Sequence, residues 1–274
     1  VDIFNMMGYE LAVFGNHEFD KGQEILVDRV FQSEYPWLGA NIVFEGTDEH
    51  PEWVEPYTIL SVGTAPHEAK IGVIGVDTNE TPEVTLLGTT EGLEFQTLTE
   101  GVMRYYDEVK AQSDAVIVVA HMGSNDSGPY EGLETLAQNM IDAGRPGPLM
   151  IGGHQHQALF EPVWVEDTAI VSAGYYGRWL GQVEVTIDMA SDTLTVDNYQ
   201  LNTITAEYTP GGLMDLVDEL YAAGEIGNAG VYNSLIKALE GVQKAIENGH
   251  ANVAANRLNA FINKVEAQSG KKIS

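Results

Sequence analysis

Val13-Phe-Gly-Asn-His-Glu-Phe-Asp20 is the stretch of sequence that decides both the fold and the site. Residues 10–14 predict a short buried strand, Gly15 ends it, and a helical segment begins near Lys21. In an open α/β sheet, ligands bind beyond the carboxyl ends of the strands. We therefore expect the polar residues of this stretch at the lip of a sheet: Asn16, His17, Glu18 and Asp20.

Two further apolar runs also end in histidine. Residues 115–120 precede His121, and residues 148–151 precede a Gly-Gly-His-Gln-His box that contains His154 and His156. One histidine beside an acidic residue is usually a surface pair, but a strand that ends in histidine three times over is hard to explain by chance. Imidazole and oxygen donors suit zinc, manganese or iron. The pattern predicts one metal site.

Together these motifs resemble the calcineurin-like metallophosphoesterases, and within them the bacterial 5′-nucleotidase branch. Gly15-Asn-His-Glu-Phe-Asp20 matches the signature of that branch, and His121 and Gly153-His-Gln-His156 match its two later histidine motifs in order. The likeness extends from Val1 to about Leu201. It implies the α/β (α+β) class, as a four-layer metallophosphoesterase β-sandwich flanked by helices, here followed by a C-terminal α-helical bundle.

The resemblance also implies a role for each site residue. The metal ligands would be Asn16, His121 and His154 for one divalent ion, and His156 for a second. His17 would stabilise the transition state and assist the leaving oxygen, and Asp20 would orient its ring. Two such ions, zinc, manganese or iron, activate a water molecule and compensate the charge on the phosphoryl oxygens.

The chain departs from the family pattern in two ways. The family's Asp-x-His and Gly-Asp motifs, which precede the Asn-His signature, do not precede it here. We therefore expect a chain that begins after the family's first strands and that hydrolyses phosphate esters poorly by itself. Helices are also expected where full-length 5′-nucleotidases have a second α/β domain that grips the nucleoside.

The implied activity is hydrolysis of small phosphorylated substrates, above all 5′-nucleotides. The alternatives among enzymes are a 2′,3′-cyclic phosphodiesterase and a UDP-sugar hydrolase. The alternative outside the enzymes is a non-catalytic extracellular binding module with a vestigial metal site. The intact residues His17, Asp20, His154 and His156 favour an enzyme, because a decaying site would be expected to lose some of them.

The composition excludes several classes of function. The formal net charge is −28 over 274 residues. Binding of a nucleic-acid polymer or of anionic lipid needs clustered Lys and Arg, so this charge argues against both. The chain has no cysteine, which excludes disulfides, thiolate metal sites and cysteine nucleophiles. No apolar run approaches the ~18 residues that a membrane span needs.

The pattern changes to helices alone after Thr209-Pro-Gly-Gly212. We expect two domains, residues 1–208 and a helical module of residues 209–274, with a protease-sensitive link near Pro210–Gly212. Leu258-Asn-Ala-Phe-Ile-Asn-Lys-Val265 and Gly270-Lys-Lys-Ile-Ser274 resemble the FIMAH-type modules that follow secreted bacterial hydrolases. This resemblance implies an extracellular or cell-surface location and a chain that stops before its natural end.

The other histidines, together with two tyrosines and an arginine, are interpreted first as surface or packing residues. Surface positions are expected for three further histidines: His50, His67 and His250. Packing at the rim is expected, with contact to a substrate as the alternative, for Tyr175, Tyr176 and Arg178. Residues 77–94 lack periodicity, and they form either a loop over the site or a surface excursion.

Overall fold

The computed structural model describes residues 1–64, 68–204, 210–268 and 271. The chain forms two compact units, Val1–Thr203 and Ile204–Ser274. The domain boundary expected between residues 208 and 209 lies outside the described residues, and so does His67.

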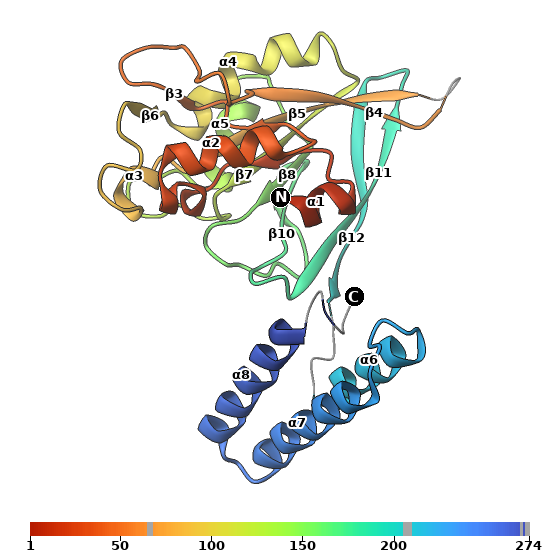
Figure 1. The fold of residues 1–274 in the computed structure, drawn as a ribbon. Helices are drawn as coiled ribbons and strands as arrows, with labels where there is room; N and C mark the ends of the chain where they lie inside the picture. Colours follow the sequence, from red (N-terminus) through yellow and green to blue (C-terminus); the bar gives the residue numbers. More distant parts are fainter. Residues whose placement is uncertain (65–67, 205–209, 269–270, 272–274) are drawn as a thin grey trace. The chain divides into compact units, whose positions relative to one another are not determined.

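The central sheet of the first unit has the strand order β4-β5-β7-β8-β10-β9 (Figure 1). Its strands are β4 (Tyr57–Val62), β5 (Ala69–Asp77), β7 (Ala115–His121), β8 (Leu149–Gly152), β9 (Val163–Val165) and β10 (Thr168–Ser172). The four central strands run parallel, and an antiparallel strand lies at each edge. The loops that leave the four parallel strands therefore all begin at the same edge of the sheet.

The helices of the first unit begin and end at local signals. They are α1 (Asp2–Met7), the 3₁₀ helix η1 (Asn16–Lys21), α2 (Gln23–Gln32), α3 (Thr81–Val84), α4 (Leu98–Lys110) and α5 (Leu133–Asp142). Gly8 ends α1 with a φ of 72°, a left-handed conformation that glycine adopts without strain. Thr97 and Glu100 form a capping box that starts α4, in which each side chain accepts the other residue's backbone N–H.

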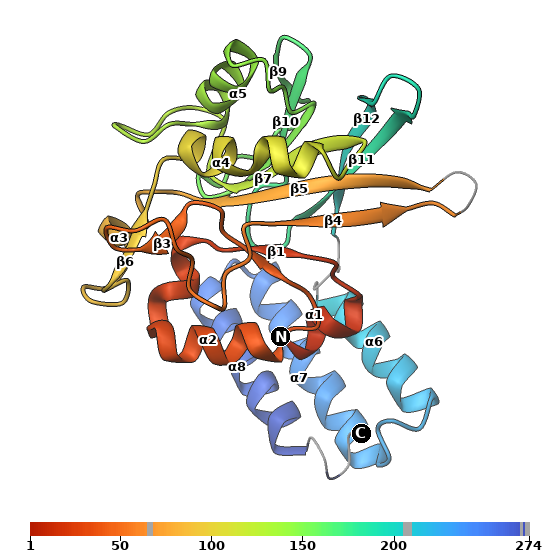
Figure 2. The ribbon, with the colours of Figure 1, turned by 90° about the horizontal axis from the view of Figure 1, so that it is seen from above.

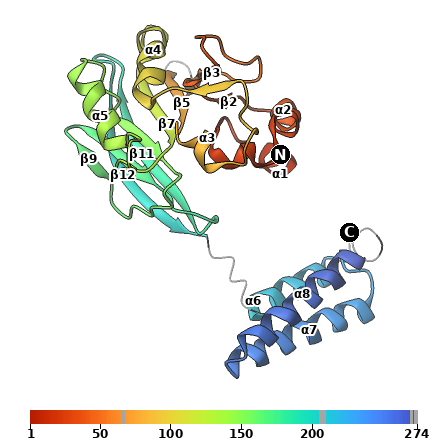
Figure 3. The same ribbon diagram turned by 90° about the vertical axis from the view of Figure 1, so that its left-hand side faces the viewer.

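The two faces of the sheet are covered by different layers. Val116 and Val118 of β7 pack against α4 and α5, whereas Ile117 packs toward the hairpin of β11 (Trp179–Asp188) and β12 (Thr193–Thr203). Helices thus cover one face and the hairpin covers the other (Figure 3). Burial of both faces explains why these strands are continuous Ile/Val runs rather than alternating ones.

A small parallel sheet carries the first motif. It pairs β1 (Ala12–Val13) with β2 (Trp37–Leu38) and packs beside β5, whose long antiparallel pairing with β4 is clear in Figure 2. Gly75 permits this approach, because a Cβ there would lie 2.3 Å from the Cβ of Leu38. The buried strand expected over residues 10–14 is therefore shorter than predicted and lies outside the central sheet.

Residues 37–44 form two separate strands, β2 and β3 (Ile42–Phe44), and β3 pairs with β6 (Leu93–Phe95). The break occurs because Asn41 bonds both backbone groups of Asp77, accepting its N–H at 2.9 Å and donating to its C=O at 2.6 Å. Residues 77–94, expected to be irregular throughout, contain α3 and part of β6.

The second unit is a bundle of α6 (Pro210–Ala222), α7 (Ala229–Glu247) and α8 (Ala251–Gln268), visible in Figure 3. Its core centres on Val217, Ile226, Leu235 and Leu239. Pro210 to Gly212, expected as a link, form the first turn of α6, where proline is favoured because its fixed φ suits the helix start. None of the helices in the described ranges is long and apolar enough to cross a membrane.

The mixed α/β class and the C-terminal helical bundle are confirmed. Within the described residues, the second sheet of the expected sandwich is the two-stranded β11–β12 hairpin.

Candidate functional site

Asn16, His121 and His154 meet beyond the carboxyl ends of β1, β7 and β8. The Oδ1 atom of Asn16 lies 2.9 Å from Nε2 of His121 and 3.2 Å from Nδ1 of His154. The two imidazole rings lie edge to face, with their centroids 5.0 Å apart. Asn16 is only 5% exposed, so this cluster is held inside the molecule.

These distances suit a metal site. Two ligand atoms that each lie about 2.0–2.1 Å from an ion, at angles of about 90° to 109°, are about 2.9–3.4 Å apart. The two contacts of Asn16 fall in this range. Three protein donors are also the number that a catalytic zinc site uses, with one position left open. The cluster therefore fits one divalent ion.

Gly15 allows His121 to reach the cluster. A Cβ on Gly15 would lie 2.6 Å from Nδ1 of His121, closer than any side chain could tolerate. Burial, together with the nearby histidines led by His154, lowers the pKa of His121 to about 4. The ring is therefore neutral at pH 7, which is the state in which imidazole binds a metal.

The histidine box adopts an unusual backbone. His154 and His156 have positive φ angles of 59° and 56°, and the N–H of Gln155 donates to the carbonyl of Gly153 at 2.7 Å. Such a three-residue turn with a left-handed centre is strained in non-glycine residues. Residual strain of this kind is typical of functional sites.

His156 is exposed and does not hydrogen-bond to the other histidines. Its ring stacks on Tyr175 with a centroid distance of 5.1 Å. No hydrogen bond joins its ring nitrogens to any residue in the described part of the chain, so the in-plane nitrogens are available to a ligand. The structure thus brings together three of the four predicted metal ligands through direct contacts, and it leaves His156 at their edge.

His17 and Asp20 form a pair on the outer side of η1. The distance from Nδ1 of His17 to Oδ2 of Asp20 is 2.9 Å, and the side chains are 71% and 43% exposed. Within one turn of the helix, Asn16 faces inward and His17 faces solvent. Among the described residues, Nε2 of His17 has no hydrogen-bond partner, so it is available to a substrate. Glu18 accepts the N–H of Gly15 at 2.9 Å, and burial raises the pKa of its carboxyl group.

Glu80 is a site residue that the sequence did not reveal. Its Oε2 lies 3.1 Å from Nε2 of His154, and the two side chains are 21% and 15% exposed. Each nitrogen of His154 therefore has a defined partner, Asn16 on one side and Glu80 on the other. Metal-binding histidines commonly donate their second N–H to a carboxylate, which fixes the ring orientation and the tautomer.

A buried network holds the loop that carries Glu80. Asp77, the last residue of β5, accepts the hydroxyl of Thr81 at 2.9 Å and the N–H of Thr78 at 2.8 Å. Asn41 bonds the backbone of Asp77 from the other side. All three partners are fully buried, and burial raises the pKa of Asp77 well above its usual range. The loop is therefore anchored at both sides of Glu80.

His50 is not the surface residue expected. Nδ1 of His50 donates to the carbonyl of Ile42 at 2.6 Å, and Nε2 accepts the hydroxyl of Tyr105 at 2.5 Å. The residues Asp48-Glu-His50 match the pattern Asp-x-His. Both ring nitrogens of His50, however, form the hydrogen bonds with Ile42 and Tyr105. His250 is exposed, as expected.

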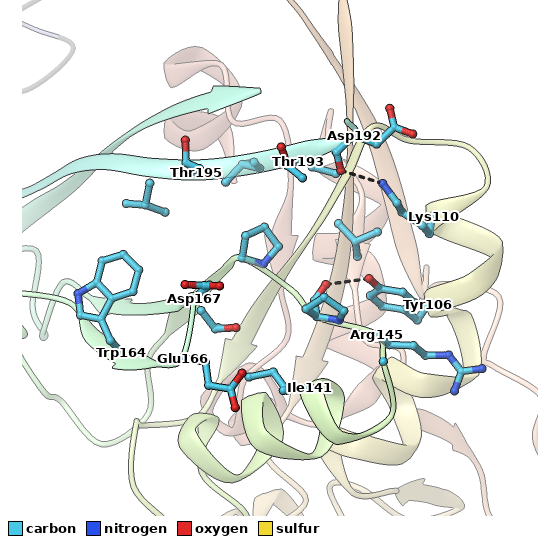
Figure 4. Close-up of a pocket in the computed structure, with 18 of the residues that line it drawn as sticks. Tyr106, Lys110, Ile141, Arg145, Trp164, Glu166, Asp167, Asp192, Thr193 and Thr195 are labelled. Atoms are coloured by element: carbon cyan, nitrogen blue, oxygen red, sulfur yellow. Dashed lines mark hydrogen bonds between the residues drawn. The ribbon is translucent and has the colours of Figure 1, made fainter. Parts of the chain in front are cut away.

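A cavity of about 1130 Å³ lies at the opposite edge of the sheet, at the amino ends of β7, β8 and β10 (Figure 4). Its cations are already paired: Arg145 forms two hydrogen bonds with Asp107, and Lys110 donates to the carbonyls of Asp114 and Asp192. None of the predicted site residues lines this cavity.

The described residues do not complete a second ion site. Across them, no group of three His, Asp or Glu side chains is placed to hold an ion, and the cluster described above relies on the amide oxygen of Asn16. Of the four predicted ligands, His156 is the one that this cluster leaves for a second ion. The residues fit one divalent ion and do not by themselves fit two.

The chain is similar to a 2′,3′-cyclic-nucleotide 2′-phosphodiesterase/3′-nucleotidase of Haemophilus influenzae, with 28% identity over 57% of this chain and 24% of that protein. It is also similar to the cell wall protein Lmo0130 of Listeria monocytogenes, with 24% identity over 79% of this chain and 31% of that protein. The chain thus spans less than a third of the length of either relative.

Among solved structures, a 5′-nucleotidase precursor from Thermus thermophilus matches with a TM-score of 0.61 and 22% identity, over 81% of this chain and 45% of that one. This likeness shows a shared fold. Residues 210–274 match the FIMAH domain. The relatives and structural neighbours are members of the 5′-nucleotidase and metallophosphoesterase family, as the motifs indicated.

Proposed function

We propose that the first unit is the histidine-bearing part of a metal-dependent phosphate-ester hydrolase whose substrates are nucleotides. The convergence of Asn16, His121 and His154 on one point carries this proposal. Similarity to nucleotide phosphoesterases supports the reaction class. The signature Asn16-His-Glu-Phe-Asp20 favours 5′-nucleotides, and a 2′,3′-cyclic phosphodiesterase or a UDP-sugar hydrolase is the alternative.

Each residue has a distinct task in this proposal. Asn16, His121 and His154 hold a divalent ion, and Glu80 orients His154. The ion, when bound, activates water and compensates phosphoryl charge. His17 donates a hydrogen bond, and then a proton, to the leaving oxygen through Nε2. Asp20 keeps the other ring nitrogen protonated and stabilises the charged ring.

The described residues do not supply a full set of donors for a second ion. His156 supplies one donor, and a lone imidazole does not hold an ion against water. We therefore infer that the 274-residue chain binds one ion firmly and hydrolyses phosphate esters slowly. Metal-dependent turnover at full rate needs more donors than the described residues bring together.

Metal titration tests the site. In calorimetry with Mn²⁺ or Zn²⁺, the chain should bind about one ion tightly. Asn16→Ala, His121→Ala and His154→Ala should each abolish that binding, whereas His250→Ala, an exposed histidine of the helical unit, should not. Unchanged binding in His154→Ala would overturn the site.

A substrate panel tests the reaction. Hydrolysis products are measured with the metal added: phosphate from AMP and from an aryl phosphate, the nucleoside monophosphate from a 2′,3′-cyclic nucleotide, and UMP with glucose 1-phosphate from UDP-glucose. Metal-dependent hydrolysis, lost in His154→Ala, supports a hydrolase, and the preferred substrate separates the three activities. Tight metal binding with no hydrolysis of any of these substrates would favour the non-catalytic binding module.

We also propose an extracellular or cell-surface location. A FIMAH domain over residues 210–274 and the similarity to a Listeria cell wall protein support it. The net charge of −28 suits solubility in such surroundings. Antibody labelling of intact cells tests this proposal, and a signal that appears only after lysis would refute it.

A further inference from the structure

Two adjacent tyrosines lie beside His156, just after β10. The ring of Tyr175 stacks on His156 at a centroid distance of 5.1 Å and an interplanar angle of 23°. The ring of Tyr176 lies 5.8 Å from His156 and meets Tyr175 edge to face at 5.0 Å. The three rings therefore form one aromatic group, which includes a histidine of the His154-Gln-His156 box.

Tyr176 is exposed and strained at the same time. Its side chain is 83% exposed, and its φ angle is +57°, a conformation that bulky residues rarely adopt. Gly174 and Gly177 on either side also have positive φ angles, of 76° and 62°. Packing inside the molecule does not explain a tyrosine that faces solvent from a strained backbone. Such an outlier beside a site indicates a functional constraint.

Tyr175, which contacts Tyr176, is itself held in place by neighbouring side chains. Arg178 donates to the hydroxyl of Tyr175 at 3.1 Å, and its guanidinium carbon lies 4.7 Å from the ring centroid. Trp179 meets the same ring edge to face at 6.3 Å. A ring fixed on several sides loses little further freedom when a ligand binds, so Tyr175 gives Tyr176 a rigid support.

We propose that Tyr176, supported by Tyr175, stacks on the base of a nucleotide whose phosphoryl group lies at the histidine cluster. Because every nucleobase has a π-face, such stacking discriminates little between one base and another. His156 follows His154 by two residues in the same strained turn and stacks on Tyr175, so the aromatic group adjoins the cluster. The stacking contact rests on the proposed function, to which it adds the recognition of the base.

The experiment compares ligands that contain or lack a base. Affinities for AMP, adenosine and ribose 5-phosphate are measured by calorimetry, with and without Mn²⁺, for the wild-type chain and for Tyr176→Gly. Glycine suits the positive φ angle, so this variant removes the ring without adding strain. We expect AMP and adenosine affinities to fall about five- to thirtyfold, and ribose 5-phosphate affinity to change less than about twofold.

Two further variants separate the outcomes. Trp164→Ala removes an exposed aromatic ring near the start of β10, at the other end of that strand, and it should leave all three affinities unchanged. Tyr176→Phe retains the ring and should bind AMP like the wild type. Equal AMP affinity in the wild type and in Tyr176→Gly would overturn the stacking inference.

Failure of the proposed function has a different signature. His154→Ala should weaken only the Mn²⁺-dependent binding of AMP and ribose 5-phosphate, and it should leave adenosine binding intact. If no phosphate ester responds to Mn²⁺, the hydrolase proposal fails, and adenosine alone then decides the stacking inference. Adenosine must bind the wild type more tightly than Tyr176→Gly, and equal or undetectable binding in both would overturn it.

Discussion

The Oδ1 atom of Asn16 lies 2.9 Å from Nε2 of His121, although 105 residues separate the two in the sequence. The contact requires the loop after β1 to reach across to the end of β7, because β1 lies outside the central sheet. Gly15 makes this possible, since only a residue without a side chain leaves room for the His121 ring.

Gly15→Ala should therefore damage the site more than the fold. The added methyl group would lie 2.6 Å from Nδ1 of His121 and would push the ring away from Asn16. We expect a loss of roughly 10- to 100-fold in Mn²⁺ or Zn²⁺ affinity, as for other changes that misplace a ligand. Calorimetry measures the affinity, and circular dichroism checks the fold.

Gly227→Ala is the matched control. A Cβ at Gly227 meets no atom within 4 Å, and its φ angle is not positive. Metal affinity should not change in this variant. An unchanged affinity in Gly15→Ala as well would show that His121 does not need its present position to bind the ion.

Glu80 should affect metal affinity although it does not itself bind the ion. Glu80→Ala leaves Nε2 of His154 without its carboxylate partner, so we expect metal affinity to fall roughly 10- to 100-fold. Glu80→Gln retains an oxygen acceptor at that place and should lose less. The exposed Glu45 provides a control, because Glu45→Ala removes the same charge from the surface. Equal losses of metal affinity in Glu80→Ala and Glu45→Ala would mean that the removed negative charge matters and the contact with His154 does not.

The sequence predicted the parts of the fold that depend on local pattern. The apolar run before His121 became β7, and the periodic residues after position 209 became three helices. Asn16, His121 and His154 could be identified because each follows an apolar run directly or after one or two glycines. Their roles as metal ligands remain predictions, as do those of His17, Asp20 and His156.

The features that sequence reasoning missed depend on contacts between distant segments. Glu80 lies in a stretch without periodicity, and only the buried contact of Asn41 with Asp77, 36 residues away, holds that stretch against the site. His50 has polar neighbours in sequence, yet Tyr105 covers it from a helix 55 residues further on. Neither contact leaves a local pattern that periodicity or spacing could reveal.

His50 should make stability depend on pH. Burial lowers the pKa of His50 below its ordinary value of 6.5, so the unfolded chain binds this proton more readily than the folded one. The stabilising contribution of the neutral ring is complete above pH 6.5, and it is lost as the pH falls through the lower pKa of the folded state. Protonation also removes the acceptor that Nε2 offers to Tyr105.

Urea unfolding of the wild type and His50→Gln at about pH 7.5 and about pH 5 measures this effect. At the higher pH the variant should be less stable by about 1–2 kcal/mol, because buried groups lose their partners. At the lower pH, the difference in stability between His50→Gln and the wild type should be smaller. His250→Gln changes an exposed histidine and should differ little from the wild type at either pH. A difference for His50→Gln that does not vary with pH would refute this account.

His17→Asn should separate catalysis from metal binding. Within the described residues, His17 makes no hydrogen bond to Asn16, His121 or His154; its partner is Asp20, and its side chain is 71% exposed. Removal of the ring therefore leaves the ion's donors in place, and metal affinity should stay within about twofold of the wild type. Turnover should fall by about 10²–10⁴-fold, the usual contribution of a positioned general acid.

The comparison is made in a form of the protein that turns over AMP with added metal, and kcat and metal affinity are measured on the same preparations. Asp20→Asn should lower kcat by less than His17→Asn, because the ring would remain while its orientation and charge support weaken. A parallel loss of metal affinity and kcat in His17→Asn would instead make His17 a ligand. In that case the outward position of its ring in η1 would have to change when the ion binds.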